Sequence, residues 1–387
     1  MKITCTQENL NQGLGFVSHI ASKNTSLPIL SNVLIKAEKG SLSLTTTNLE
    51  MGINCLVRGK IDKDGSYTVS SKLFNDYVSL LPNQKIEIEL KDDFLEIKCE
   101  DQDTKIKGNS AEEFPLIPQV EKKNPYTCKI SDLLNALSQV IFAVSVSETR
   151  PEISGIYFNF SDNLLTLTAT DSYRLAEKKI KLKEKGKEAK EVIIPARTIM
   201  ELFRILSGLV GTGETTAEEG NNNKLEIYFE DNQVLFVVNN VELVSRIIEG
   251  QYPNYKQIIP TTHKTRAIIG VSDFIKAVKT AALFSRTGIY DINLEFKSGK
   301  FIVSSTNNQL GENKSKLESK IDGEDNKIIV NSRYLLDGLQ NIDSSDVIFE
   351  MTDINNPCLL KPAESLDEKK EAIAAEDYLY IVMPIKQ

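Results

Sequence analysis

The sequence predicts an α+β protein made of three consecutive copies of one unit, each with two helices packed on antiparallel sheets. Three observations predict this fold: a first amphipathic helix, a strand pair that ends in a Thr-Asn or Thr-Asp turn, and a strand that runs into a second helix. They recur in the same order, and the turn lies at Thr47-Asn48, Thr170-Asp171 and Thr306-Asn307. Because three separate features share nearly the same spacing, we interpret them as an internal repeat.

The first helix of each copy is predicted from apolar residues at i, i+3, i+4 and i+7. This pattern occurs at Leu10, Gly13, Leu14 and Val17, at Leu133, Ala136, Leu137 and Val140, and at Phe274, Ala277, Val278 and Ala281. Each helix carries one apolar stripe, so we expect the helices to lie together on one face of a sheet.

The strand pair of each copy alternates apolar and polar residues and is rich in β-branched side chains, as in antiparallel hairpins. The three pairs are Val33–Ile35 with Leu42–Thr47, Ile156–Phe158 with Leu165–Thr170, and Ile292–Leu294 with Phe301–Thr306. In the first pair, a Lys-Gly turn joins the strands.

The third feature is a strand that leads directly into the second helix. The strands end at Ser70, Pro195 and Asn331, and these residue types suit the first positions of a helix. The helices that follow are predicted from Phe74 to Leu81, Ile199 to Leu206, and Leu335 to Ile342.

Two extended, proline-bearing links separate the copies, from Phe114 to Pro125 and from Gln251 to Pro260. They predict domains at residues 1–122, 123–251 and 252–387. The acidic composition, with a net charge of −8, is that of a globular protein and not of one that coats nucleic acid. The sequence lacks a membrane span and an apolar signal peptide, so we expect a cytoplasmic protein.

No arrangement of residues predicts a catalytic centre, a metal site or a cofactor. The five cysteines stand singly, and the two histidines, His19 and His263, are far apart in the sequence. The glycine-rich segment Gly208–Gly213 lacks the Lys-Ser/Thr of a phosphate loop and follows a helix instead of opening one. These absences argue against an enzyme.

Positive charge lies on the predicted helices at Lys72, Arg197, Arg204, Lys276, Lys279 and Arg333, with Arg286 just past a helix. An ordinary solvated helix face is the alternative interpretation. A repeated array would align these faces, and their cations would then meet DNA phosphates without reading bases. We therefore predict that these helix residues, together with Lys23, face DNA.

Five strings make the chain resemble the bacterial DNA polymerase III beta subunits, the replicative sliding clamps. The strings are Ser26–Asn32, Asn48–Met51, Thr170–Leu175, Gly250–Tyr255 and Tyr380–Ile385. In that family, two chains form a head-to-tail ring of six similar domains. The helices line a hole that holds duplex DNA, and the clamp tethers the polymerase without catalysis of its own.

The resemblance implies several partners. They are duplex DNA bound independently of sequence, the catalytic subunit of the replicative polymerase, a clamp loader, other proteins with a clamp-binding motif, and a second copy of the chain. No membrane is implied. The resemblance also implies a dimer interface that pairs the region of Thr104 and Ile106 with Leu283 and Phe284, one of which we expect to point inward.

In the family, partner peptides bind in a pocket between the second and third domains, and the resemblance carries this site to particular positions. The main part matches Ile153, Thr170, Ser172, Tyr173, Arg174, Leu175, Pro253, Gln257, Ile258, Ile381 and Met383. A shallower part matches Asn331, Tyr334, Pro357, Pro384, Ile385 and Lys386. Apolar walls would receive aliphatic side chains, and Arg174 would fix the peptide backbone. Each apolar residue taken alone is equally compatible with plain core.

Two other classes of function remain open from the residues alone. One is a nucleic-acid-processing enzyme, or an inactive relative of one, on a repeated fold. The other is a repeat scaffold that binds only proteins. Retention on circular DNA separates a clamp from the scaffold, and nuclease or ATPase activity would support the enzyme.

Overall fold

The computed structural model describes residues 1–21, 27–147, 149–184, 188–211, 223–297, 299–366 and 372–386. Contacts within the chain group these residues into two compact units. The first unit takes residues from Met1–Ser131, Lys183–Lys187 and Met200–Ile247. The second takes residues from Asp132–Leu182, Glu188–Ile199 and Ile248–Gln387.

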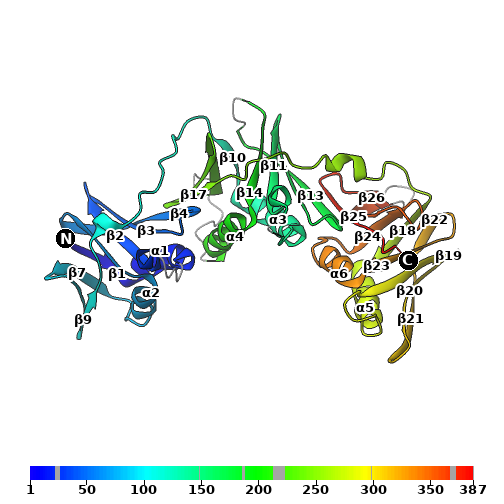
Figure 1. Cartoon of the computed structure of the whole chain (residues 1–387), viewed down its shortest axis with the longest axis horizontal. Coiled ribbons are helices and arrows are strands. Elements are labelled where there is room, and N and C mark those ends of the chain that lie inside the picture. The colour runs from blue at the N-terminus through cyan, green and yellow to red at the C-terminus, as the bar shows by residue number, and fades with distance from the viewer. Residues whose placement is uncertain are drawn as a thin grey trace. The chain divides into compact units, whose positions relative to one another are not determined.

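The described residues contain the helix pairs that the repeat predicts (Figure 1). The helices are α1 (Gln7–Val17), α2 (Ser71–Ser79), α3 (Ile130–Val140), α4 (Ala196–Gly211), α5 (Val271–Ala282) and α6 (Ser332–Gln340). Oγ of Ser70 accepts a hydrogen bond from the amide of Leu73, so Ser70 is the N-cap of α2. Asn331 caps α6 in the same way, and Pro195 directly precedes α4. The predicted helix starts are therefore confirmed.

The first unit contains two antiparallel sheets. The five-stranded sheet has the order β5 (Gly59–Lys63), β1 (Lys2–Thr6), β7 (Lys85–Lys91), β8 (Phe94–Cys99), β9 (Gln102–Lys107). The eight-stranded sheet has the order β10 (Tyr126–Lys129), β15 (Lys224–Glu230), β16 (Gln233–Val238), β17 (Val241–Arg246), β4 (Met51–Val57), β3 (Ser41–Thr47), β2 (Asn32–Glu38), β6 (Gly65–Ser70).

The helices α1 and α2 pack against each other, and α1 also packs on β1, β3 and β4. The predicted stripe of α1 is buried, because Leu10, Leu14 and Val17 are inaccessible to solvent. The predicted hairpin forms as β2 and β3, and its two-residue turn, Lys39 and Gly40, has positive φ at both positions. Such a turn matches the natural twist of paired strands.

The eight-stranded sheet joins strands of the first and second copies. Strand β17 pairs with β4 in antiparallel register, for example Leu243 opposite Ile53. This pairing extends one sheet across the boundary between the first and second copies. The two copies are therefore joined by backbone hydrogen bonds as well as by the linking segment.

The second unit also contains two antiparallel sheets. The larger has the order β14 (Lys190–Pro195), β11 (Gly155–Ser161), β12 (Leu164–Thr170), β13 (Arg174–Lys181), β27 (Tyr378–Val382), β25 (Cys358–Leu366), β24 (Asp346–Met351), β18 (Thr265–Gly270), β22 (Lys320–Gly323), and β26 (Ala372–Ala374) pairs with β25. The four-stranded sheet has the order β21 (Gly311–Leu317), β20 (Lys300–Asn307), β19 (Asp291–Lys297), β23 (Asn326–Asn331).

In the second unit, α5 packs against α6 and against strands β18 to β21. The ring of Phe274 on α5 meets the rings of Phe301 and Phe349 edge-on in the core. A Cβ atom at Gly338 of α6 would lie 2.1 Å from the ring of Tyr380. The glycine in the predicted helix therefore lets α6 approach the last strand closely.

Strand β27, near the end of the chain, pairs with β13 of the second copy, with Ile381 opposite Leu175. This joint repeats the pairing of β17 with β4. It also brings the C-terminal segment to the turn between β12 and β13, where the predicted partner-peptide residues Thr170 and Ser172–Leu175 lie.

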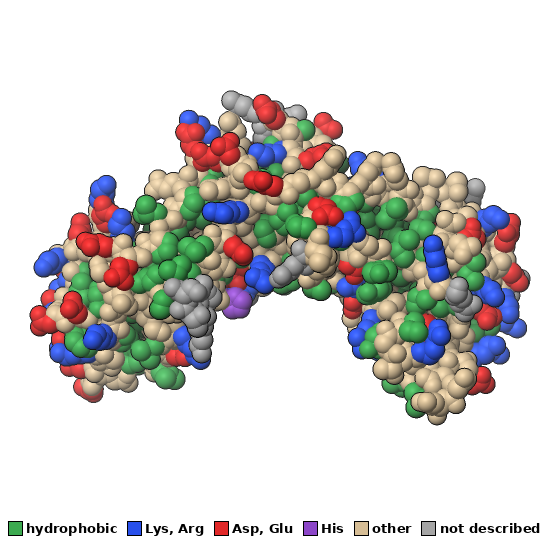
Figure 2. Space-filling model, in the orientation of Figure 1, with side chains coloured by type: hydrophobic (Ala, Val, Ile, Leu, Met, Phe, Trp, Pro, Cys, Tyr) green, Lys and Arg blue, Asp and Glu red, His purple; other side chains and the backbone are tan. Residues whose placement is uncertain are grey.

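On the face shown in Figure 2, acidic and basic side chains are interspersed, and hydrophobic side chains reach the surface in several places. No helix among the described residues is long and apolar enough to cross a membrane. In the same residues, no group of three or more His, Cys, Asp or Glu side chains is arranged to hold a metal ion.

Candidate functional site

Side-chain hydrogen bonds hold the turn between β12 and β13. Oγ1 of Thr170 donates to the carbonyl oxygen of Arg174 at 2.6 Å and accepts from the amide of Ser172 at 3.1 Å. Oδ1 of Asp171 accepts from the amides of Tyr173 and Arg174 at 2.9 and 3.0 Å. Ser172 adopts a φ of 78°, in the left-handed region. The turn thus fixes the direction in which Tyr173 and Arg174 point.

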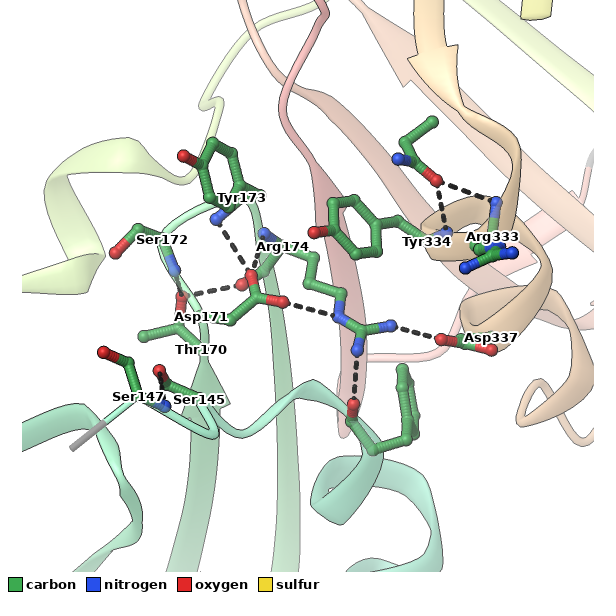
Figure 3. Close-up of polar contacts among 12 residues, drawn as sticks. Ser145, Ser147, Thr170, Asp171, Ser172, Tyr173, Arg174, Arg333, Tyr334 and Asp337 are labelled. Atoms are coloured by element: carbon green, nitrogen blue, oxygen red, sulfur yellow. Dashed lines mark hydrogen bonds and ion pairs between the residues drawn. The ribbon is translucent and has the colours of Figure 1, made fainter. Parts of the chain in front are cut away.

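The guanidinium of Arg174 connects three elements of the second unit (Figure 3). Nε donates to Oδ2 of Asp171 at 3.0 Å, Nη1 to Oδ2 of Asp337 on α6 at 2.5 Å, and Nη2 to the carbonyl oxygen of Phe142 at 2.7 Å. Its central carbon also lies 4.7 Å from the centre of the Tyr334 ring, a cation–π contact.

These contacts add a role to the one expected of Arg174. The resemblance implies that it fixes the backbone of a bound peptide, and three of the five N–H groups of a guanidinium already donate within the chain. We therefore assign Arg174 a positioning role: it holds α6 and the aromatic ring of Tyr334 against the β12–β13 turn.

The start of α6 presents Tyr334 to the same place. Oδ1 of Asn331 accepts from the amides of Arg333 and Tyr334 at 2.9 and 3.3 Å, which fixes the first turn of the helix. The ring of Tyr334 stacks on that of Tyr173, with centroids 6.3 Å apart. The structure thus brings together Tyr173, Arg174, Asn331 and Tyr334, which come from two distant parts of the sequence.

Three of the predicted apolar residues lie beneath this surface. Ile153, Leu175 and Ile381 are buried in one hydrophobic cluster. Other members of that cluster are Tyr157, Ile193, Tyr252, Tyr255 and Leu359. Because their side chains have almost no exposed area, the three residues form the floor under the site and not its accessible wall.

The segment that follows the second copy crosses this cluster. The hydroxyl of Tyr255 donates to Oε2 of Glu177 at 2.6 Å. Burial, reinforced by this carboxylate, raises the pKa of Tyr255, so its hydroxyl stays protonated and remains a donor. Pro253 is partly buried, whereas Gln257 and Ile258 are exposed in the short 3₁₀ turn Tyr255–Ile258.

The C-terminal segment lies alongside the turn. The amide of Met383 donates to the carbonyl oxygen of Tyr173 at 2.8 Å, and that of Ile385 donates to Ile329 at 2.8 Å. Met383, Pro384 and Ile385 are partly exposed, Lys386 is exposed, and Pro357 precedes the strand that pairs with β27. These residues remain a predicted wall of the pocket.

Cations recur at one position of the second helix in every copy. Lys72, Arg197 and Arg333 are each the second residue of α2, α4 and α6, and all three are exposed. A positive charge in the first turn opposes the helix dipole and gives no stability to an isolated helix. An arrangement that recurs against this preference suggests an anionic partner. The ring of Tyr290 supports the guanidinium of Arg333 at 3.5 Å.

Three further lysines were predicted to face DNA, and the structure describes two of them. Lys276 and Lys279 are exposed on α5, and Lys276 lies 3.2 Å from Asp273. Lys23 lies outside the described residues.

Arg204, which we predicted to face DNA, is held by contacts within the chain. Its guanidinium donates to the carbonyl oxygens of Gly15 and Phe16 at 2.9 and 2.6 Å, and to Oε1 of Glu201. Glu201 is buried and also contacts Nδ1 of His19 at 2.7 Å. Arg204 therefore satisfies carbonyl groups at the end of α1 and neutralises Glu201, and we withdraw it from the DNA-facing set.

The residues predicted at the dimer interface differ in how far their side chains are exposed. Thr104 is half-buried, whereas the side chain of Ile106 points into the core of the first unit and is not available to a partner. Their strand, β9, is the last strand of its sheet, so its outer backbone groups have no neighbouring strand among the described residues. In the second unit, Leu283 is 72% exposed and Phe284 is half-buried, in line with the expectation that one of the pair points inward.

Sequence reasoning missed several residues that the structure connects to these sites. Asp337 and Phe142 hold Arg174, and Glu201 holds Arg204. Leu80, just past α2, is 81% exposed, whereas its neighbour Leu81 is buried. One signal was available: Asp337 lies one turn after Tyr334 on the same helix face.

Comparison with known families matches the chain domain by domain. The N-terminal domain model of the DNA polymerase III beta subunit matches residues 1–118, the central domain model residues 127–254, and the C-terminal domain model residues 256–375. The chain belongs to the DNA polymerase III beta-subunit family.

Individual relatives agree with this assignment. The chain is 30% identical over 376 residues to a protein of Staphylococcus epidermidis named "Beta sliding clamp", covering 94% of this chain and 96% of the relative. The crystal structure of the DNA polymerase sliding clamp from Bacillus subtilis superposes with a TM-score of 0.90 at 27% identity, over 100% of this chain and 99% of that one. The beta subunit of Thermotoga maritima gives a TM-score of 0.88 at 25% identity, with the same coverage.

Within this family, the helix pairs and antiparallel sheets described above are three tandem clamp domains. The predicted fold class is therefore confirmed.

Proposed function

We propose that this protein is a DNA sliding clamp that encircles duplex DNA and tethers the replicative polymerase, and that it has no catalysis of its own. The observation that carries the proposal is the ordered match to all three domains of the beta subunit, from residue 1 to residue 375. The names of its relatives support the same function. We place the domains at residues 1–122, 123–251 and 252–387.

DNA contact would come from the helices. The repeated cations Lys72, Arg197 and Arg333, with Lys276 and Lys279, are exposed and lie on or at the start of helices. Lysine and arginine side chains meet phosphates without specifying bases, which suits a protein that must move along any sequence. The net charge of −8 makes this contact local and opposes tight wrapping of DNA.

Ring closure would join two chains head to tail, so that different surfaces of the chain meet. Two features support such a joint. Strands β9 and β21 are terminal strands of their sheets, so each offers one row of backbone hydrogen-bonding groups. Leu80 and Leu283 are large apolar side chains that are 81% and 72% exposed, and burying them would favour association.

Partner proteins would dock at the surface around Tyr173, Tyr334 and Met383. The replicative polymerase, other proteins with a clamp-binding motif and the clamp loader are the proposed partners. Support comes from the arrangement of a stacked aromatic pair over a rigid floor, beside a partly exposed C-terminal segment. An aliphatic side chain of a peptide fits such a surface.

Retention on circular DNA tests the proposal directly. The full-length protein is loaded with the clamp loader and ATP onto a nicked circular plasmid and then separated by gel filtration. We expect it to co-elute with the circle and to be released when a restriction enzyme linearises the plasmid. Equal retention on circular and linear DNA would contradict encirclement.

A further inference from the structure

The first copy contains a turn that repeats the turn at the partner surface bond for bond. Oγ1 of Thr47 donates to the carbonyl oxygen of Met51 at 2.9 Å and accepts from the amide of Leu49 at 3.1 Å. Oδ1 of Asn48 accepts from the amides of Glu50 and Met51 at 3.0 and 2.9 Å. Leu49 has a φ of 75°, close to the 78° of Ser172. Met51 therefore occupies the position that Arg174 occupies in the second copy.

The strands around the two turns also correspond. Gly52 lies opposite Thr47 and Val244, as Leu175 lies opposite Thr170 and Ile381. The amide of Arg246 donates to the carbonyl oxygen of Glu50 at 3.1 Å, as that of Met383 donates to Tyr173. Arg246 is thus the counterpart of Met383.

This first turn borders a cavity of about 250 Å³ within the first unit. Its lining includes Leu49, Met51, Gly52, Val244 and Arg246, together with the link segment at Leu116–Pro118. A Cβ atom at Gly52 would lie 2.7 Å from Cδ1 of Ile117, so the absent side chain makes room for Ile117, which forms part of the floor. The cavity is large enough for one aliphatic side chain and too small for a helix.

The rim of the cavity differs chemically from that of the second copy. Leu116 is 97% exposed and Leu49 is 49% exposed, so two leucines project beside the opening. Arg246 is exposed and forms no ion pair with any carboxylate of the described residues. Glu50 is the one acidic residue of the lining and lies in the turn directly before β4.

We propose that this cavity is a second peptide-docking pocket, which takes a short extended segment with an aliphatic side chain next to a carboxylate. The aliphatic group would enter between Met51, Val244 and Ile117, and the carboxylate would pair with Arg246. The inference rests on the proposed function, because it extends a partner-peptide site to its counterpart in the repeat. The replacement of Met383 by Arg246 gives this pocket a preference for acidic peptides.

Two methionines allow both pockets to be observed in one experiment. Met51 lies in the new pocket and Met383 at the proposed partner surface, whereas Met351 is buried elsewhere and serves as a reference. The full-length protein is labelled with ¹³C at its methionine methyl groups and titrated with the peptide Ac-Gly-Leu-Asp-Gly-NH₂. We expect a saturable shift of the Met51 methyl signal and none of the Met351 signal.

Matched substitutions in the protein and in the peptide test the proposed ion pair between Arg246 and the peptide carboxylate. Arg246→Gln should weaken the binding reported by Met51 by about threefold to fivefold, the range of an exposed ion pair. Replacing the peptide's Asp by Asn should weaken binding to the unaltered protein equally and leave binding to the R246Q variant unchanged. Leu49→Ser should weaken binding of both peptides.

The outcomes separate this inference from the proposed function. A saturable shift of Met383 without one of Met51 overturns the second pocket and leaves the partner surface intact. A Met51 shift that is insensitive to R246Q overturns the preference for a carboxylate. No shift at either methionine, up to the solubility limit of the peptide, overturns the second pocket and counts against the partner surface as well.

Discussion

Arg174 on β13 donates a hydrogen bond to Asp337 on α6, although the two residues are separated by 163 positions in the chain. The contact joins the turn of the second copy to the second helix of the third copy. With Tyr334 stacked beside it, the pair sets the shape of the surface at which we propose that partner peptides bind.

Removing Asp337 should loosen this surface. Asp337→Ala leaves Nη1 of the largely buried Arg174 without its carboxylate, which costs roughly 1 to 3 kcal/mol of local stability. We expect faster hydrogen exchange at the amides of Tyr173 and Arg174 and a weaker affinity for polymerase-derived peptides. Asp343→Ala, at an exposed position after the same helix, is the control and should change neither quantity. Unaltered exchange in D337A would contradict the positioning role of Arg174.

The cations at the second helix position should contribute to DNA binding through phosphates. Each of the substitutions Lys72→Glu, Arg197→Glu and Arg333→Glu should lower DNA affinity, and the slope of log K against log salt should fall by about 0.9 for each lost contact. Lys181→Glu reverses an exposed charge on a strand and is the matched control. Equal effects of the control and the helix variants would mean that only net charge matters.

Arg204 should behave differently from these three residues. Arg204→Ala leaves Glu201 buried without its main partner, so we expect the first unit to lose about 2 to 4 kcal/mol of stability in denaturant unfolding. The double variant E201Q/R204A should recover part of the loss, because it removes the buried charge. The salt dependence of DNA binding should stay as it is in the unaltered protein. A decrease of the slope in R204A would return Arg204 to the DNA-facing set.

The exposed leucines should determine the association of two chains. Leu80→Asp or Leu283→Asp places a charge in the proposed apolar contact, and light scattering should then report a mass near 43.2 kDa instead of twice that value. Ile373→Asp changes an exposed apolar residue elsewhere and should leave the dimer unchanged. A dimer that persists in both leucine variants would contradict the proposed contact.

The sequence predicted the helices and paired strands well because their signals are local. Apolar spacing identified α1, and a cap residue identified the starts of α2 and α6. The direction in which an individual side chain points was harder to predict from the sequence. Ile106 lies on a strand whose two faces alternate, and the sequence did not reveal that its face is the inner one.

Contacts between side chains and residues far away in the sequence could not be predicted from the residue pattern. Arg174 and Arg204 each pair with a carboxylate three residues earlier, but Arg174 also contacts Asp337, 163 residues away, and Arg204 contacts two backbone carbonyl groups 188 and 189 residues away. Every residue has a backbone carbonyl group, so the sequence does not show which carbonyl a side chain will contact. The family resemblance, in contrast, located Tyr173, Asn331 and Tyr334 together, since it transfers positions and needs no knowledge of contacts.

The pairing of β17 with β4 has a consequence for the newly made chain. Strand β4 ends at Val57, whereas its partner β17 ends at Arg246. This edge of β4 therefore has no partner strand until about 190 further residues have been synthesised. At about 5 to 20 residues per second, the ribosome needs roughly 10 to 40 s to supply them. During that time the open edge can pair with other nascent chains, which makes this step a point at which chaperones would protect the protein.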